Sequence, residues 1–159
     1  MATVQAVTNY VIMQVSEEER ELSLLKLQKL LYYTQAWHLA HYSAQLFPAR
    51  FQAWVHGPVC REVYDRFRDA YSLYSGIPAT EVPANFDPDA EFTEQERELI
   101  DSVLDVYAGF TGSQLEQMTH QEDPWMEARR GVPPAARSEN ELNEETMRRF
   151  YSARIAHNA

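Results

Sequence analysis

The residues from Ser23 to Tyr42 form an uninterrupted stretch that constrains the fold more than any other part of the chain. The stretch contains no Gly or Pro, and it is rich in Leu, Lys, Gln and Ala, which favour helices. Ser23 is suited to accept a hydrogen bond from a first-turn N–H. Large apolar side chains fall on more than one side, with Leu31 opposite Trp37. A helix that is apolar nearly all round is buried, so the sequence predicts a central helix.

Polar residues are scattered among the apolar positions of this predicted helix. They are Gln28, Gln35, His38 and His41. Because buried polar groups need hydrogen-bond partners, we expect several of these side chains to bind backbone groups of neighbouring segments.

Length and composition indicate a single globular domain over residues 1–159. Apolar residues make up 45% and aromatic residues 12% of the chain, which separates it from disordered sequences. The one cysteine, Cys60, rules out an internal disulfide. Apolar runs end before the roughly 18 residues that a membrane span needs, and the N-terminus lacks the features of a secretory signal. We therefore expect a cytoplasmic protein without a membrane partner.

Negative charge is concentrated between Glu81 and Asp105. The formal net charge is −10, and this segment holds nine acids against one base, Arg97. An acidic surface repels nucleic acid and attracts a basic protein. The most distinctive candidates for such a partner-facing surface are Asp87, Asp89, Glu91 and Glu94. The alternative is a solvated surface that only promotes solubility.

Helical periodicity and turn residues outline the elements before the acidic segment. Apolar spacing predicts a first helix over residues 4–15. Residues 51–56 alternate in polarity and predict a short extended segment. Pro58 is suited to the first position of a helix, so we expect a helix from there that carries Val63 and Phe67 on one face, together with Val59 and Ala70.

The later elements are predicted mainly from their caps. Residues 80–89 are predicted to form a surface loop, and Thr93 and Glu96 are predicted to form a capping box before a helix. A second box is predicted at Ser113, and Asp123 is expected to cap a helix whose first residue is Pro124. A last helix is expected over about residues 143–157. The predicted fold is all-α, with six or seven helices around the central helix, or the same with a small β-hairpin.

The chemistry-bearing residues do not form a diagnostic catalytic or metal motif. His38 and His41 lie three apart on one helix, but the fuller H-E-x-x-H pattern is absent. Completing a site would require His56, His120, Glu122 or Asp123 to come together through folding. Cys60 is interpreted as a core residue rather than a nucleophile. No phosphate-binding loop, nucleophile elbow or basic aromatic patch is present. We therefore expect no catalytic, metal or cofactor-binding residues, and no direct binding of nucleic acid.

Seven aromatic residues form a large set for a chain of this length. They are expected to be mostly core, and any that are exposed would mark a protein-binding surface. The set comprises Tyr32, Tyr33, Trp37, Trp54, Tyr64, Phe67 and Trp125.

The strings KLQKLLYYTQAWHLAHYSAQLF and FQAWVHGPVCREVY resemble the signature of the Panacea domain family. The family is also described as SocA-like, or as phage-associated GepA-like. A third block follows at residues 115–129, so that the resemblance spans about residues 22–130. The motif residues are Lys26, Gln28, Lys29, Tyr32, Trp54, His56, Gly57, Pro58, Tyr64, Thr119, His120 and Trp125.

The resemblance implies the antitoxin of a toxin–antitoxin pair, which neutralises a cognate toxin by direct protein–protein contact. It implies no catalytic residues. The motif residues are interpreted as structural, with partner binding as the alternative. Some family members carry an added DNA-binding region, and we expect none here because the residues outside the matched blocks are neither long nor basic enough to form one.

Two rival functions remain. One is an adaptor that delivers a client protein to a protease, with a protease or chaperone as a further partner. The other is a small enzyme that uses a metal ion or one of His38, His41, His56 and His120.

Overall fold

The computed structural model describes the backbone of residues 1–158 and the side chains of residues 1–155. Ala159, the last residue of the predicted domain, lies outside the described residues. The described part contains eight α-helices: α1 (Val4–Glu17), α2 (Leu24–Tyr42), α3 (Arg61–Phe67), α4 (Pro88–Glu91), α5 (Glu94–Tyr107), α6 (Gly112–His120), α7 (Asp123–Ala128) and α8 (Glu144–Asn158). It also contains strands β1 (Gln52–Trp54) and β2 (Gly57–Val59), and the 3-10 turn η1 (Ala79–Glu81).

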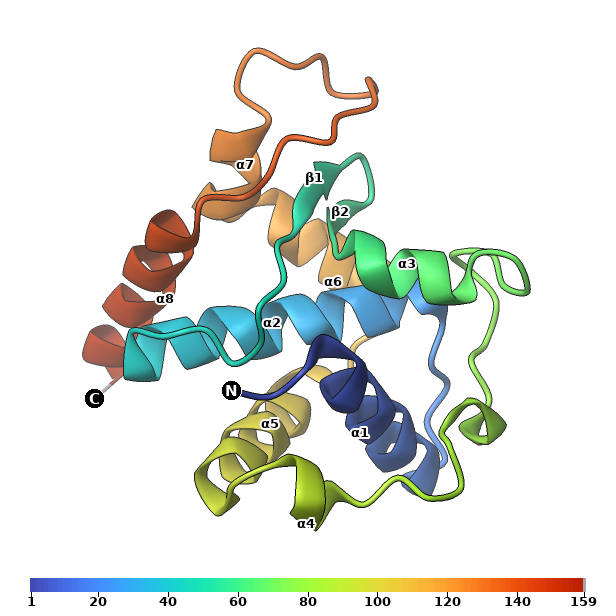
Figure 1. Ribbon diagram of the computed structural model, residues 1–159. Helices are drawn as coiled ribbons and strands as arrows, with labels where there is room; N and C mark the ends of the chain where they lie inside the picture. The colour runs from blue at the N-terminus through green and yellow to red at the C-terminus, as the bar shows by residue number, and fades with distance from the viewer. Residues whose placement is uncertain (159) are drawn as a thin grey trace.

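Helix α2 runs through the middle of the molecule, as the sequence predicts (Figure 1). It packs against α1, α3, α5, α6, α8 and strand β2. Leu24, Leu27, Leu30 and Leu31 are completely buried, so apolar contacts surround the helix. The Ser23 side chain accepts a hydrogen bond from the Lys26 N–H, which confirms the predicted cap.

The polar residues of α2 divide into two groups. Gln28 and Gln35 are completely buried and hydrogen-bonded to backbone groups, as expected. His38 is half-buried and its Nδ1 atom lies 2.6 Å from the Ala44 carbonyl oxygen, whereas His41 is exposed. The end of the helix is therefore less buried than its middle.

The predicted helix start at Pro58 is wrong, because Pro58 lies in β2 and α3 begins at Arg61. The two strands are antiparallel, with Ala53 opposite Pro58 and Trp54 opposite Gly57. The Ala53 N–H points away from β2, toward the Asn140 carbonyl oxygen at 2.7 Å. This pair therefore needs no N–H from Pro58, and the strand tolerates proline. Val59 consequently belongs to the strand, and Ala70 lies beyond the end of α3.

Two other predicted caps are displaced by one or two residues. The capping box of α6 uses Thr111 and Gln114 rather than Ser113. A Cβ atom on Gly112 would lie 3.1 Å from the Ser23 Oγ atom, so close packing on α2 explains a glycine in this first turn. At α7 the cap position is Glu122, not Asp123, and its carboxylate is directed elsewhere.

The remaining cap predictions are closer to the structure. The Thr93–Glu96 capping box is present at the start of α5. Asn143 accepts a hydrogen bond from the Thr146 N–H before α8. The predicted loop over residues 80–89 contains part of η1 and the start of the one-turn helix α4, where Asp87 is the cap and Pro88 the first residue. These short turns account for the helix count above the predicted six or seven.

Candidate functional site: an aromatic groove bordered by arginines

Two polar residues of α2 hold the end of the β-hairpin. The Gln28 side chain donates to the Cys60 carbonyl oxygen at 3.1 Å and accepts from the Cys60 N–H at 2.8 Å. The Lys29 Nζ atom donates to the Pro58 carbonyl oxygen at 2.9 Å. Both side chains are completely buried. These motif residues therefore act on backbone groups and fix where the hairpin sits.

Gly57 is required where the hairpin crosses α2 and α6. Its φ angle is +93°, and a Cβ atom there would lie 2.7 Å from Lys29 Cε and 2.8 Å from Thr119 Oγ1. Both distances are too short for a real contact, so three motif residues meet at a point that excludes any side chain.

Burial of Lys29 has an electrostatic consequence. Removal of the ammonium group from water lowers the pKa of Lys29 to about 7, and the nearby Glu116 carboxylate only partly opposes this effect. Lys26 is also buried and donates to the Ala108 carbonyl oxygen at 2.6 Å, and burial lowers its pKa. Both lysines have long side chains whose terminal nitrogen donates a hydrogen bond to a backbone carbonyl of a neighbouring segment, which joins that segment to α2.

A second set of motif residues connects α6 and α7 to the hairpin. The His120 ring stacks on the Trp125 ring, with centroids 4.0 Å apart. The Trp125 Nε1–H donates to the Trp54 carbonyl oxygen at 2.8 Å. Burial lowers the pKa of His120, and its Nε2 atom is buried without a hydrogen-bond partner among the described residues. This stack orients the backbone of Trp54.

Glu122 and three tyrosines form a buried network that sequence reasoning missed. The Glu122 Oε1 atom accepts hydrogen bonds from the hydroxyls of Tyr33 and Tyr151, each at 2.8 Å. Tyr151 also shares a hydrogen bond of 3.1 Å with Tyr32. Burial raises the pKa of Glu122, and the two hydroxyl donors lower it in part. The network ties α7 to α2 and α8, which explains why Glu122 does not cap α7.

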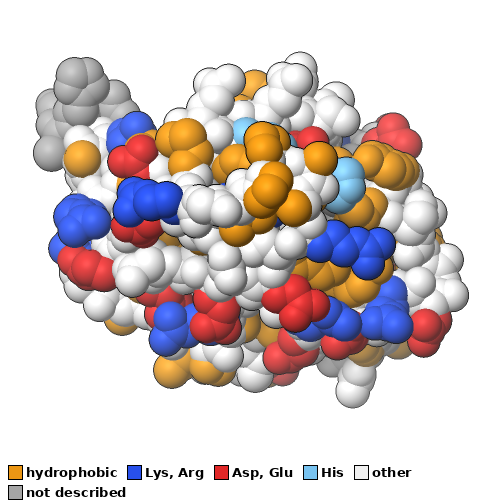
Figure 2. All heavy atoms as spheres, turned by 90° about the horizontal axis from the view of Figure 1, so that it is seen from above, with side chains coloured by type: hydrophobic (Ala, Val, Ile, Leu, Met, Phe, Trp, Pro, Cys, Tyr) orange, Lys and Arg blue, Asp and Glu red, His pale blue; other side chains and the backbone are white. Residues whose placement is uncertain are grey.

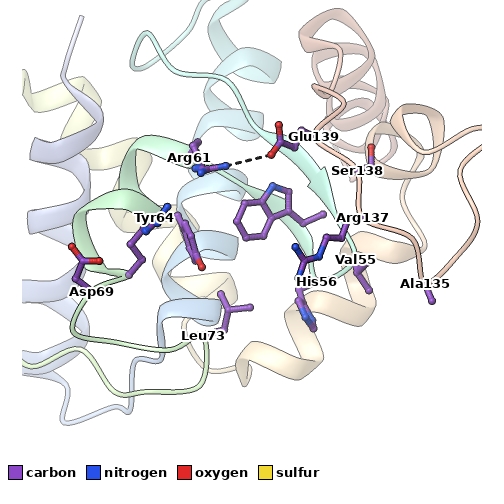
Figure 3. A pocket seen from close by; sticks show the side chains of 12 residues that line it. Val55, His56, Arg61, Tyr64, Asp69, Leu73, Ala135, Arg137, Ser138 and Glu139 are labelled. Carbon is purple, nitrogen blue, oxygen red and sulfur yellow. Dashed lines mark hydrogen bonds and ion pairs between the residues drawn. The ribbon is translucent and has the colours of Figure 1, made fainter.

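An open groove of about 800 Å³ lies beside the hairpin. Three segments form it: the hairpin turn, α3 with the loop that follows, and a strap, defined as residues 131–141 between α7 and α8. Figure 3 shows side chains from all three around the opening. The lining comprises Trp54, Val55, His56, Arg61, Tyr64, Arg68, Asp69, Leu73, Ala135, Arg137, Ser138 and Glu139.

The buried Arg129 holds the strap in place. Its guanidinium group donates to the carbonyl oxygens of Ala53 at 2.8 Å, Pro133 at 3.1 Å and Ala136 at 2.7 Å. The strap also pairs with β1, since the Ala53 N–H donates to the Asn140 carbonyl oxygen. The wall of the groove is therefore fixed by backbone hydrogen bonds, although the strap lacks regular secondary structure.

The groove separates the motif residues into two groups. Only Trp54, His56 and Tyr64 line it, and all three are half-buried. The Trp54 and Tyr64 rings meet edge to face with centroids 4.8 Å apart, and His56 Nδ1 lies 3.1 Å from Glu116 Oε1. The other motif residues lie away from it: Lys26, Gln28, Lys29, Tyr32, Gly57, Pro58 and Thr119 are buried, and His120 and Trp125 are half-buried.

The predicted acidic surface lies on the other side of α2 from the hairpin and α7 (Figure 1). Asp87, Asp89, Glu91 and Glu94 are all exposed, at α4 and the start of α5. Asp89 pairs with Arg97. Other acids of the segment have internal roles: Glu96 completes the capping box, and Asp101 accepts from the Tyr10 hydroxyl at 2.6 Å.

The face that is uppermost in Figure 1 has a different character. Figure 2 shows hydrophobic side chains gathered there, with Lys or Arg side chains and Asp or Glu side chains around them. The groove beside the hairpin and the acidic residues of α4 and α5 lie on opposite sides of α2.

The histidines are distributed over separate places in the fold. His38 and His41 lie at the end of α2, whereas His56 and His120 contact α6 and α7. In the described part of the chain, no group of three or more His, Cys, Asp and Glu residues is arranged to hold a metal ion. Cys60 is buried, as predicted for a core cysteine, and burial raises the pKa of its thiol.

A family model described as "Antitoxin SocA-like, Panacea domain" matches residues 27–126, which is more than half of the chain. The chain belongs to this family. Comparisons with curated proteins and with solved structures gave no match. The matched region of this Panacea domain contains most of α2, the hairpin, α3, α6 and most of α7. None of the described helices is long and apolar enough to cross a membrane.

Proposed function

We propose that this Panacea domain is the antitoxin of a toxin–antitoxin pair and silences a toxin encoded beside it by direct contact. Membership of the antitoxin family is the observation that carries this proposal. The rigid groove supports it, because Trp, Tyr and Arg side chains of the kind that line it are the residue types that dominate binding energy in protein interfaces. The proposed action needs no cofactor and no catalytic step, and takes place in the cytoplasm.

Co-expression tests the proposal. The product of the adjacent open reading frame is expressed alone and together with this chain, and growth is followed. We expect growth arrest by the neighbour alone and recovery with the antitoxin. The Leu31→Asp variant serves as the unfolded control, because it places a charge in the completely buried core of α2. Arrest that persists beside the wild-type chain, with both proteins present, would refute neutralisation.

The toxin is expected to be basic. The exposed carboxylates at α4 and the start of α5 attract positive charge. A basic surface is common on proteins that act on RNA or nucleotides, so a toxin of that class fits this surface.

An adaptor for a protease is the second candidate. The groove and the acidic surface lie on opposite sides of α2, so one could hold the client while the other holds the protease or a chaperone. The half-life of the toxin in cells separates the two functions. Direct inhibition predicts an unchanged half-life and inhibition by purified antitoxin alone, whereas an adaptor predicts faster degradation and no inhibition without the protease.

The enzyme hypothesis is tested by metal analysis of the purified protein. A stoichiometric metal ion that is lost when His38 and His41 are replaced together would favour a metal-dependent activity over a purely binding function.

A further inference from the structure

We propose that the groove binds an extended segment of the toxin in which a carboxylate side chain stands next to an aromatic side chain. The inference rests on the proposed antitoxin function and names the part of the toxin that this surface recognises. Three features support it: unfilled guanidinium donors, a fixed aromatic surface, and nearby carboxylates that limit how much negative charge is accepted.

The arginines around the groove have more hydrogen-bond donors than their neighbours fill. Each guanidinium group has five N–H donors. Arg61 uses one donor for Asp65 at 3.0 Å and another for Glu139 at 3.4 Å. Arg68 shares the same Asp65 oxygen at 3.4 Å. Arg137 makes no hydrogen bond or ion pair with another described residue, and its side chain stands at the opening in Figure 3.

The existing ion pairs are easily exchanged. The Glu139 side chain is 73% exposed and its contact with Arg61 is long, at 3.4 Å. Exposed pairs of this kind contribute little to stability. An incoming carboxylate can therefore displace Glu139 from Arg61 at small cost.

The aromatic floor of the groove is preorganised. The Trp54 Nε1–H donates to Gln52 Oε1 at 2.8 Å, and the Trp54 carbonyl oxygen accepts from Trp125. The edge-to-face contact with Tyr64 limits rotation further. A fixed aromatic surface gains contact area without the entropy cost of ordering, and an aromatic side chain of the partner packs well on it.

The carboxylates of the lining argue against nucleic acid. Asp69 and Glu139 stand beside the arginines, and the whole chain has a net charge of −10. A polyanion is repelled by this combination, whereas a segment with one or two carboxylates meets mainly the guanidinium groups. The volume of about 800 Å³ suits a few residues of extended chain.

Binding of two synthetic peptides to the full chain tests the inference. The probes are the heptapeptide GSDFEGS and its neutral counterpart GSNFQGS, titrated while tryptophan fluorescence is recorded. We expect about millimolar affinity for the acidic peptide and at least about tenfold weaker binding of the neutral one. The Arg137→Gln variant should remove this preference, and Arg149→Gln, an exposed arginine of α8 outside the groove, should retain it.

Two results would overturn the inference. One is equal or absent binding of the acidic and neutral peptides by the wild-type chain. The other is an Arg137→Gln variant that keeps the wild-type preference. A melting temperature equal to that of the wild type confirms that each variant is folded. The Trp54→Leu variant is an independent test, because it should bind both peptides more weakly than the wild type.

The co-expression experiment separates this inference from the proposed function. Recovery of growth together with no preference for the acidic peptide would refute only the groove assignment. Continued arrest beside the wild-type chain would refute the antitoxin function whatever the peptides do. In the complex, Arg137→Glu should weaken toxin binding by about tenfold or more, because a repulsive contact replaces a charge-assisted hydrogen bond.

Discussion

At the scale of single residues, this domain places charged and polar side chains where apolar ones are usual. Lys29 and Gln28 are completely buried, and each makes its hydrogen bonds to backbone atoms of residues 58–60. Since an unpaired buried polar group costs about 1–3 kcal/mol, these bonds position the hairpin strongly. The family motif thus contains residues whose polarity serves the fold, next to Trp54, His56 and Tyr64, which face the groove.

Lys29 should make stability depend on pH above neutrality. Its pKa is about 7 in the folded protein and about 10.4 when unfolded. Between these values the unfolded chain binds more protons, so stability rises with pH by up to about 1.4 kcal/mol per unit, and the contribution is flat below pH 7. The Lys29→Met variant should lack this rise. Urea unfolding of both proteins at several pH values measures it, and parallel curves would contradict the assignment.

Gly57 should tolerate substitution far less than Gly131. Both have positive φ angles, +93° and +84°, but a Cβ atom on Gly131 would meet nothing within 4 Å. Gly131→Ala therefore measures backbone strain alone, about 1–2 kcal/mol. Gly57→Ala adds the clash with Lys29 and Thr119, a further cost of roughly 1–3 kcal/mol. Equal losses in chemical denaturation would show that the crowding around Gly57 is unimportant.

At the scale of elements, α2 is the support on which the other helices and the hairpin are assembled. It packs against five helices and β2, and its middle is buried on every side. The strap adds a third extended segment to the hairpin, because Glu141 forms an antiparallel bridge with Gln52 and the Asn140 carbonyl oxygen accepts from the Ala53 N–H. The position of the strap, which forms a wall of the groove, therefore depends on the hairpin, and the hairpin is in turn held by α2.

Leu31→Ala should reveal how much α2 contributes to stability. Leu31 is completely buried, so the variant should lose roughly 2–5 kcal/mol of unfolding free energy. The matched control is Val106→Ala in α5, where the side chain is 61% exposed and the change should be within about 0.5 kcal/mol. A denaturation midpoint that is the same for Leu31→Ala and wild type would contradict the central position of this helix.

At the scale of the whole molecule, the groove and the acidic surface lie on opposite sides of α2. The groove provides fixed aromatic and guanidinium groups for short-range recognition. The acidic surface at α4 and the start of α5 acts over a longer range, because exposed charges influence mainly the rate of encounter.

Neutralising the acidic surface should slow association with a basic toxin. Asp87, Asp89, Glu91 and Glu94 are replaced by Asn or Gln, and association is measured by stopped flow at low and high salt. We expect a slower rate at low salt that approaches the wild-type rate at high salt, where the charges are screened.

The control for this variant neutralises four exposed acids elsewhere: Glu17, Glu18, Glu19 and Glu21. The two sets are matched, because Glu18 pairs with Arg20 as Asp89 pairs with Arg97. If the variant of the α4–α5 acids associates at the wild-type rate at both salt concentrations, these residues only promote solubility and do not guide association. Equal slowing by both sets would indicate net charge rather than this surface.

Local sequence signals determined the elements whose causes lie within one or two turns of chain. The buried α2, the Ser23 cap and the Thr93–Glu96 box follow from periodicity and from side chains that bond to N–H groups three residues away. The all-α fold with a small hairpin follows in the same way. Family membership was also readable from the sequence, because most of the motif residues lie within the matched residues 27–126.

The tertiary structure alone decided the features that depend on residues far apart in the chain. Pro58 is a strand residue because the Ala53 N–H donates to Asn140 instead of pairing with it. Glu122 rather than Asp123 occupies the cap position of α7, and its carboxylate accepts hydrogen bonds from Tyr33 and Tyr151 instead of capping the helix. The groove joins Trp54 and Tyr64 to Arg137, which local patterns cannot bring together. In each case a buried hydrogen bond or a close contact outweighs a local preference of about 1 kcal/mol, since an unpaired buried group costs more.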